Sequence, residues 1–129
     1  MWLDFIDYIN NQTNNKPTQI LEVGVGNFFK IADTLNKYPN INVLLMDIKP
    51  NREDVIKDDI NNPNKELYTD VSIIYSIRPP YEIQKQLSDL ARDIGALLII
   101  KPYLSEELAS GLNMKLVNYK KAIFFIKQY

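Results

Sequence analysis

The sequence contains neither cysteine nor histidine among its 129 residues. Without cysteine, the chain cannot form a disulfide scaffold, a thiolate zinc site or a cysteine nucleophile. Without histidine, it lacks Ser-His-Asp triads, HExxH metal sites and the commonest general base. We therefore predict no metal site, and we exclude the usual nucleophilic triads.

Long apolar runs and an excess of one charge are also missing. The longest apolar run, residues 96–100, is far shorter than the ~20 residues that a membrane-spanning helix needs. The N-terminus carries Asp4 and Asp7 where a signal peptide has Lys or Arg. The net charge of −1 gives no overall field that would attract nucleic acid. We expect one cytoplasmic domain over residues 1–129, with no membrane segment and no indication of a nucleic-acid partner.

Helical and strand patterns alternate along the chain. Helices are predicted over residues 2–9, 28–37, 80–93 and 105–110, and strands over 19–23, 41–47, 55–57, 71–77 and 96–101. Two last strands, 115–119 and 122–127, are predicted to form an antiparallel hairpin. This order indicates an α/β fold with a mostly parallel sheet that ends in that hairpin.

The connection before the third strand is unusually short. Only seven residues separate Asp47 from Val55, whereas a parallel crossover usually takes a dozen or more. The third strand is therefore either vestigial or preceded by a loop in place of the usual helix.

Two of the four glycines, Gly24 and Gly26, lie in one predicted strand-to-helix turn. Glycine there lets the backbone approach a ligand, and the helix that follows offers free N–H groups. Asp47 lies about twenty residues further on, at the end of the next strand, where an acid accepts hydrogen bonds from ribose hydroxyls. The pattern predicts a nucleoside-containing ligand, and the alternative is a tight turn followed by a loop aspartate.

The turn resembles motif I of the class I S-adenosylmethionine-dependent methyltransferases, usually written E/D-x-G-x-G-x-G. Glu22, Gly24 and Gly26 match the motif, whereas Phe28 replaces its last glycine. The resemblance implies S-adenosylmethionine as cofactor, with the acid organising the amino-acid end of that ligand. A nicotinamide-dependent oxidoreductase is a poorer reading, because Phe29 stands where the dinucleotide pattern has its third glycine.

Acids further along the chain extend the resemblance. Asp47 matches the ribose-binding acid of these methyltransferases. Asp58 and Asp59 resemble the acid after the third strand that faces the adenine amino group, and Asp59 is the preferred candidate. The alternative for this pair is a solvated acidic loop.

The segment after the fourth strand holds the candidate catalytic residues, which are Arg78, Tyr81 and Ser76. Residues 79–81, Pro-Pro-Tyr, resemble the N/D-P-P-Y motif of amino-methylating enzymes. Arg78 takes the place of the Asn or Asp that accepts hydrogen bonds from the target amine, and a guanidinium can only donate. Our hypothesis is that Arg78 recognises an anionic group on a substrate or partner, and the alternative is an ion pair with Glu82 or Asp70.

Over nearly its full length the chain also resembles a small archaeal protein family with no established activity. The resemblance rests on the stretches ILEVGVGNF, D-D-I-x-x-P and I-Y-S-I-R-P-P. It implies a minimal Rossmann-like class I methyltransferase fold. We expect an S-adenosylmethionine-dependent methyltransferase of unknown substrate, or alternatively a non-catalytic nucleoside-ligand-binding module or subunit of a complex.

Loops in this chain are too short to enclose a methyl acceptor, so a second subunit or partner would have to supply those walls. The apolar residues 124–126 of the C-terminal hairpin predict an interface, either with a second copy of the chain or with a protein partner. The alternative is that the helix over residues 2–9 covers that surface.

Overall fold

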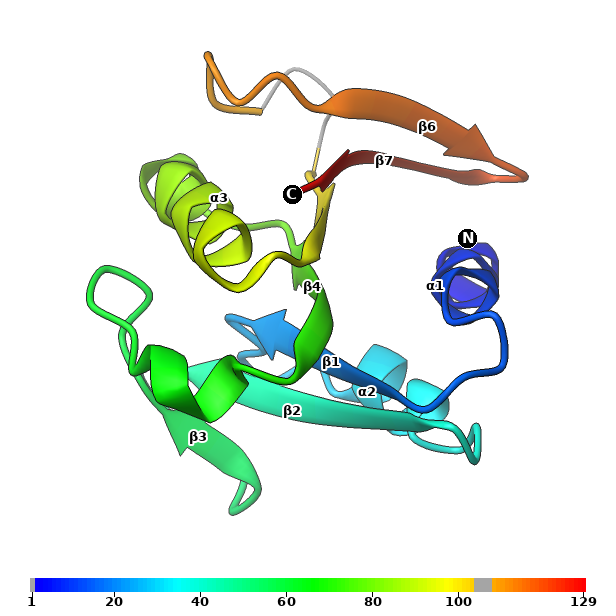
Figure 1. The fold of residues 1–129 in the computed structure, drawn as a ribbon, viewed down its shortest axis with the longest axis horizontal. Coiled ribbons are helices and arrows are strands. Elements are labelled where there is room, and N and C mark those ends of the chain that lie inside the picture. Colours follow the sequence, from blue (N-terminus) through cyan, green and yellow to red (C-terminus); the bar gives the residue numbers. More distant parts are fainter. Residues whose placement is uncertain (1, 104–107) are drawn as a thin grey trace.

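The centre of the molecule is a seven-stranded sheet in the order β3-β2-β1-β4-β5-β7-β6. It is seen in a computed structural model that describes residues 2–103 and 108–129. The first five strands are parallel, β7 is antiparallel to β5, and β6 is antiparallel to β7 (Figure 1). The strands are β1 (Thr18–Val23), β2 (Ile41–Asp47), β3 (Val55–Lys57), β4 (Val71–Ile77), β5 (Leu97–Lys101), β6 (Lys115–Tyr119) and β7 (Ala122–Gln128). This sheet confirms the predicted α/β fold with a C-terminal antiparallel hairpin.

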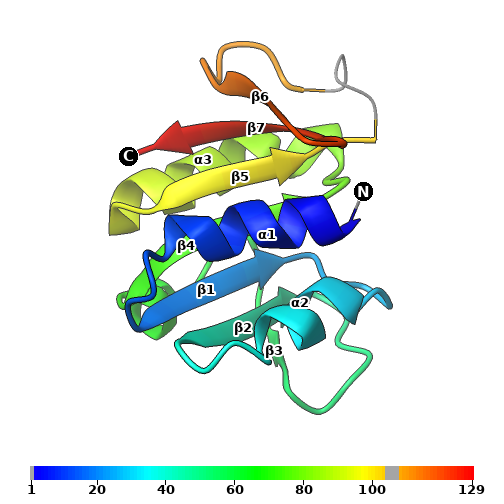
Figure 2. The same cartoon turned by 90° about the vertical axis from the view of Figure 1, so that its right-hand side faces the viewer.

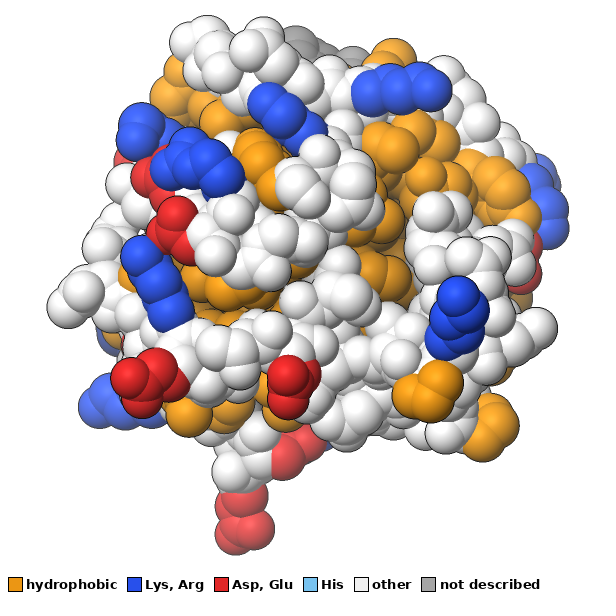
Figure 3. Space-filling model, viewed as in Figure 1, with side chains coloured by type: hydrophobic (Ala, Val, Ile, Leu, Met, Phe, Trp, Pro, Cys, Tyr) orange, Lys and Arg blue, Asp and Glu red, His pale blue; other side chains and the backbone are white. Residues whose placement is uncertain are grey.

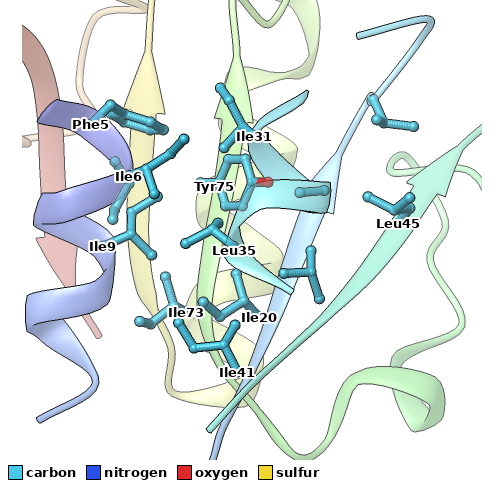
Figure 4. Packing of buried hydrophobic residues seen from close by; sticks show 14 of the residues in the cluster. Phe5, Ile6, Ile9, Ile20, Ile31, Leu35, Ile41, Leu45, Ile73 and Tyr75 are labelled. Carbon is cyan, nitrogen blue, oxygen red and sulfur yellow. The ribbon is translucent and has the colours of Figure 1, made fainter. Parts of the chain in front are cut away.

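Helices cover both faces of the sheet, which makes three layers (Figure 2). One face carries α1 (Trp2–Gln12) and α2 (Lys30–Leu35), and the other carries α3 (Tyr81–Ile94) and the 3-10 helix η1 (Lys65–Tyr68). Successive residues of β1 point to opposite faces, so that Ile20 packs under α1 and α2 while Leu21 packs under α3. Figure 4 shows the first of these two cores, which includes Phe5, Ile31 and Tyr75.

Helix α2 is shorter than the predicted range of residues 28–37. The periodicity assigned Phe28 to the buried face of a helix, but its ring packs against Trp2 with 5.2 Å between ring centroids. Phe29 lies under the guanidinium of Arg52, 4.1 Å from it, at the residue before the helix begins. A helix is predicted over residues 105–110, of which residues 105–107 lie outside the described residues. Residues 108–110 are described, and they are not helical.

The short connection between β2 and β3 is a loop, and β3 is a parallel strand of three residues paired with the end of β2. Arg52 fixes this loop, because its guanidinium binds both carboxylate oxygens of Asp33 at 2.9 Å and also binds Asp54 at 2.8 and 2.9 Å. The same hydrogen bonds lower the pKa of both carboxyls. The connection between β2 and β3 is thus a loop that Arg52 anchors to α2, where the usual crossover would have a helix.

Helix α1 covers one face of the C-terminal hairpin. The ring of Phe124 lies 5.3 Å from that of Phe5 and 4.7 Å from that of Tyr8, measured between centroids. The opposite face of the hairpin remains open, with Leu116 46% and Ile123 45% exposed. Helix α1 therefore covers one face of the hairpin, as the alternative to an interface predicted. Binding of a partner or a second copy to the other face stays a prediction.

Charged side chains of both signs are spread over the face drawn in Figure 3, with hydrophobic side chains visible between them. Neither sign forms one continuous patch on that face. Within residues 2–103 and 108–129, no helix combines the length and apolar character that crossing a bilayer requires.

Candidate functional site

Two hollows open where the parallel strands end, and they share Gly24. The first, which we call the Asp47 hollow, has a volume of about 330 Å³, and the second, the Trp2 hollow, about 250 Å³. The Asp47 hollow is lined by Val23, Gly24, Met46, Asp47, Ile48, Asp58, Asp59, Ile60, Asn61, Pro80 and Ile83. The Trp2 hollow is lined by Trp2, Glu22, Gly24, Val25, Phe28, Ile77 and Arg78. The site therefore has two parts on opposite sides of the end of β1.

The glycine turn is held in place by Asp47. Gly24 and Gly26 have φ values of +74° and +57°, in the left-handed region that side chains disfavour. The Gly26 N–H donates to one carboxylate oxygen of Asp47 at 2.8 Å, and the Lys49 N–H donates to the other at 2.9 Å. Each oxygen keeps a further lone pair that a ligand hydroxyl can use. A Cβ on Gly24 would meet nothing within 4 Å, so the turn leaves open space toward both hollows.

The two acids after β3 have different surroundings. Asp58 accepts hydrogen bonds from the N–H groups of Asp59 and Asn64 at 2.9 and 3.0 Å and from the Tyr68 hydroxyl at 2.6 Å. The Asp59 carboxylate accepts one from the Asn61 N–H at 2.9 Å. Asp58 therefore organises its loop, and the geometry favours Asp59 as the acid with capacity left for a ligand.

Glu22 is the buried acid of the Trp2 hollow, with only 1% of its surface exposed. The hydroxyl of Tyr75, its neighbour across β1 and β4, donates to Glu22 Oε1 at 2.6 Å. Burial raises the pKa of Glu22 to about 7, because the charged form loses water, and the hydrogen bond from Tyr75 partly opposes this rise. Sequence reasoning proposed Glu22 but missed Tyr75, whose signal is the single tyrosine of β4, in a strand that also carries Ser72 and Ser76.

The three candidate catalytic residues lie in different places. Ser76 is buried, and its hydroxyl donates to the Val23 carbonyl at 2.8 Å, so that it links β4 to β1. Tyr81 begins α3 with 58% of its surface exposed, and it does not line either hollow. Arg78 is the candidate that lines the Trp2 hollow.

Aromatic rings surround the Arg78 guanidinium. Its carbon lies 5.7 Å from the centroid of the Trp2 ring and 5.2 Å from that of Tyr103. The alternative prediction was an ion pair with Asp70 or Glu82, both of which lie in the described part of the chain, and neither pairs with Arg78 there. Sequence reasoning missed these rings because they come from α1 and from the segment after β5, far from Arg78 along the chain.

The strand order, the glycine turn after β1 and the acids after β2 and β3 together define a class I methyltransferase-like Rossmann fold. The antibiotic-resistance methyltransferase Kmr has a similar structure, with a TM-score of 0.62 and 10% identity, over 95% of this chain and 91% of Kmr. An RNA methyltransferase from Salinibacter ruber, solved with S-adenosyl-L-homocysteine, gives a TM-score of 0.62 and 8% identity, over 96% of this chain and 89% of that one. These likenesses confirm the fold that the resemblance implied.

The chain belongs to the uncharacterised protein family UPF0146, whose model matches residues 2–129. A UPF0146 protein of the archaeon Methanothermobacter thermautotrophicus is 40% identical over 125 residues, which cover 97% of this chain and 93% of the relative. The expected membership of a small archaeal family is confirmed.

Proposed function

We propose that this chain binds S-adenosylmethionine and transfers its methyl group to an acceptor. The observation that carries the proposal is the pair of hollows joined at Gly24. Their linings differ in chemistry, and each suits one part of that ligand.

The Asp47 hollow suits a nucleoside without phosphate. Asp47 would accept hydrogen bonds from the ribose hydroxyls and Asp59 from the adenine amino group, and Ile60 and Ile83 would contact the base. The carboxylates that line this hollow would repel the phosphates of a dinucleotide or of ATP. The carboxylates of this hollow therefore fit an adenosine group without phosphate better than they fit NAD.

The Trp2 hollow suits the amino-acid end of the same ligand. Glu22 lies there as a buried carboxyl that an ammonium group would favour in its charged form. The rings of Trp2 and Phe28, which pack on each other, shield the hollow from water.

When bound, S-adenosylmethionine would supply an electrophilic methyl group: the acceptor's lone pair would form a bond to the methyl carbon as the carbon–sulfur bond breaks, S-adenosylhomocysteine would leave, and the acceptor's proton would pass to water. The chain's own contribution is positioning, which can lower the barrier without a dedicated base. The lack of histidine is therefore compatible with this reaction.

A non-catalytic binding module is the second candidate. It is favoured by Ser76 and Tyr81, neither of which lines a hollow, and by Arg78, which can only donate hydrogen bonds. A module would bind the ligand in the same way and would never methylate an acceptor.

Calorimetric titration of the full chain tests the proposal, with S-adenosylhomocysteine as the ligand and NAD and ATP as controls. We expect saturable binding of S-adenosylhomocysteine and at least tenfold weaker binding of both phosphate-containing nucleotides. Equal binding of all three, or tighter binding of NAD, would contradict the proposal.

A further inference from the structure

Arg78 is held in an unusual backbone conformation at the rim of the Trp2 hollow. Its φ is +50°, a left-handed value that residues other than glycine rarely adopt. The Arg78 N–H donates to the carbonyl of Lys101 at the end of β5, and Pro79 follows buried. Such strained positions persist where the surrounding structure enforces them, and they are frequent at functional sites.

Two aromatic rings lie near the Arg78 guanidinium. Its carbon is 5.7 Å from the centroid of the Trp2 ring and 5.2 Å from that of Tyr103. Cation–π contacts of this kind use the charge of the guanidinium and leave its N–H groups able to donate hydrogen bonds to a ligand. Two parallel N–H donors match the oxygens of a phosphate or carboxylate.

Lys101 adds a second positive charge at the same rim. It pairs with Ile77 in the sheet register, so it lies across from the residue before Arg78. Burial and the neighbouring charge of Arg78 lower the pKa of Lys101. The ion pairs formed within the described residues include neither of these two cations. Repulsion between two like charges held together would be relieved by an anionic group that binds to both.

We propose that Arg78 and Lys101 form an oxyanion site that binds a phosphate group of the methyl acceptor, beside the Trp2 hollow. This inference rests on the proposed function, because it names the substrate class of the same site. The phosphate is either a terminal phosphomonoester or the phosphodiester of a nucleic-acid backbone. The hollow proposed for the amino-acid end of the cofactor and the site proposed for the acceptor's phosphate thus share Arg78.

The test is a titration of the full chain, saturated with S-adenosylhomocysteine, with phenyl phosphate and with its diester methyl phenyl phosphate. Phenol, which has the ring and no phosphate, is the control ligand. Tighter binding of the monoester indicates a terminal phosphate, whereas equal or tighter binding of the diester indicates a nucleic-acid backbone. Either of these results supports the site.

Variants locate the binding. We expect Arg78→Gln to weaken phenyl phosphate binding at least tenfold and Arg78→Lys nearly as much, because lysine keeps the charge and loses the planar fork. Lys101→Gln should weaken it about threefold or more. Lys57→Gln removes the same charge from β3, an edge strand separated from β5 by β2, β1 and β4, and should have no effect. Thermal unfolding of each variant confirms that it is folded.

Three results would overturn the oxyanion site. One is binding of phenyl phosphate no tighter than that of phenol, and another is binding to the Arg78 variants as tight as to the unaltered chain. The third is that Arg78→Gln weakens the binding of S-adenosylhomocysteine but not that of 5′-methylthioadenosine, which lacks the amino-acid end. Arg78 would then bind the cofactor's carboxylate. Absence of S-adenosylhomocysteine binding would instead contradict the proposed function, and the phosphate titrations would then decide the oxyanion site on the free protein.

Discussion

The Asp47 hollow and the Trp2 hollow differ in how the chain builds them. In the Asp47 hollow, Asp47 and Asp59 each accept a hydrogen bond from an N–H two residues away, on Lys49 and Asn61, and Asp47 also accepts one from Gly26. The Trp2 hollow brings together α1, the glycine turn and the end of β4. The acids of the nucleoside side are thus oriented in part by neighbouring backbone N–H groups, whereas the surroundings of Arg78 depend on packing between distant segments.

The two regions also differ in charge. Carboxylates line the Asp47 hollow, and at the far rim of the Trp2 hollow Arg78 lies near Lys101. One ligand region therefore disfavours phosphate, and the other attracts it.

The largest expected effect concerns Glu22, the buried acid of the Trp2 hollow. Its pKa is raised from 4.5 in the unfolded chain to about 7 in the folded one. The contribution of Glu22 to the free energy of unfolding is fully present below pH 4.5 and is lost as the pH rises through 7. The reason is that Glu22 ionises at a lower pH in the unfolded chain than in the folded one. Between pH 5 and pH 8, Glu22→Gln should gain roughly 2–3 kcal/mol of unfolding free energy relative to the unaltered chain. Urea unfolding at both pH values measures this gain.

Glu66→Gln serves as the control for that experiment, because Glu66 is an exposed acid on η1. It should follow the unaltered chain at both pH values. If the free energy of unfolding of Glu22→Gln changes with pH as that of Glu66→Gln does, burial does not raise the pKa of Glu22.

Asp47→Asn tests the nucleoside side. The amide keeps one oxygen as acceptor for the Gly26 N–H and loses the charge that ribose hydroxyls would meet. We expect S-adenosylhomocysteine binding to weaken by about 1–3 kcal/mol, measured by calorimetry. Asp70→Asn, an exposed acid outside both hollows, should bind normally. Equal affinities for the two variants would remove Asp47 from the site.

Gly24→Ala and Gly95→Ala form a matched pair. Both glycines have φ values near +73° and open space around a Cβ, but Gly95 ends α3 and lines neither hollow. Each substitution should cost about 1 kcal/mol of stability because of the left-handed backbone. Only Gly24→Ala should also weaken the binding of S-adenosylhomocysteine, because the alanine methyl group would occupy the space that the two hollows share. Loss of binding in both variants would mean that backbone strain, rather than the hollow, explains the effect.

Self-association through the open face of the hairpin is the smallest effect that we expect. Light scattering at increasing concentration should show a dimer whose formation Leu116→Lys suppresses, with stability changed by about 0.5 kcal/mol or less. Lys115→Gln, next to it on the exposed edge, is the control. A monomer at every concentration would leave only a heterologous partner.

Sequence patterns located most of the sheet. The observed bounds of β2, β3 and β4 equal the predicted ranges, because short, mainly apolar segments bounded by polar residues specify buried parallel strands. The 3-10 helix η1 was not predicted, since its four residues carry too little periodicity. Helix α2 was overextended because Phe28 looked like a core residue and packs on Trp2 instead.

The same contrast holds for the site. Glu22, Gly24 and Asp47 could be found from the sequence because they lie at or just after the ends of two predicted parallel strands, whose carboxyl ends meet at one edge of the sheet. Trp2, Lys101 and Tyr103 could not, because only the packing of α1 and β5 beside β4 brings them to Arg78. Local motifs thus locate the glycine turn and its acids, and tertiary structure assembles the surroundings of Arg78.

The most direct test of the central claim is amide NMR of the 15N-labelled chain titrated with S-adenosylhomocysteine. We predict saturable shifts for the amides of Gly24, Gly26 and Asp59, with Gly95 and Gly111 unmoved. No saturable shift, or shifts confined to residues outside both hollows, would contradict the account.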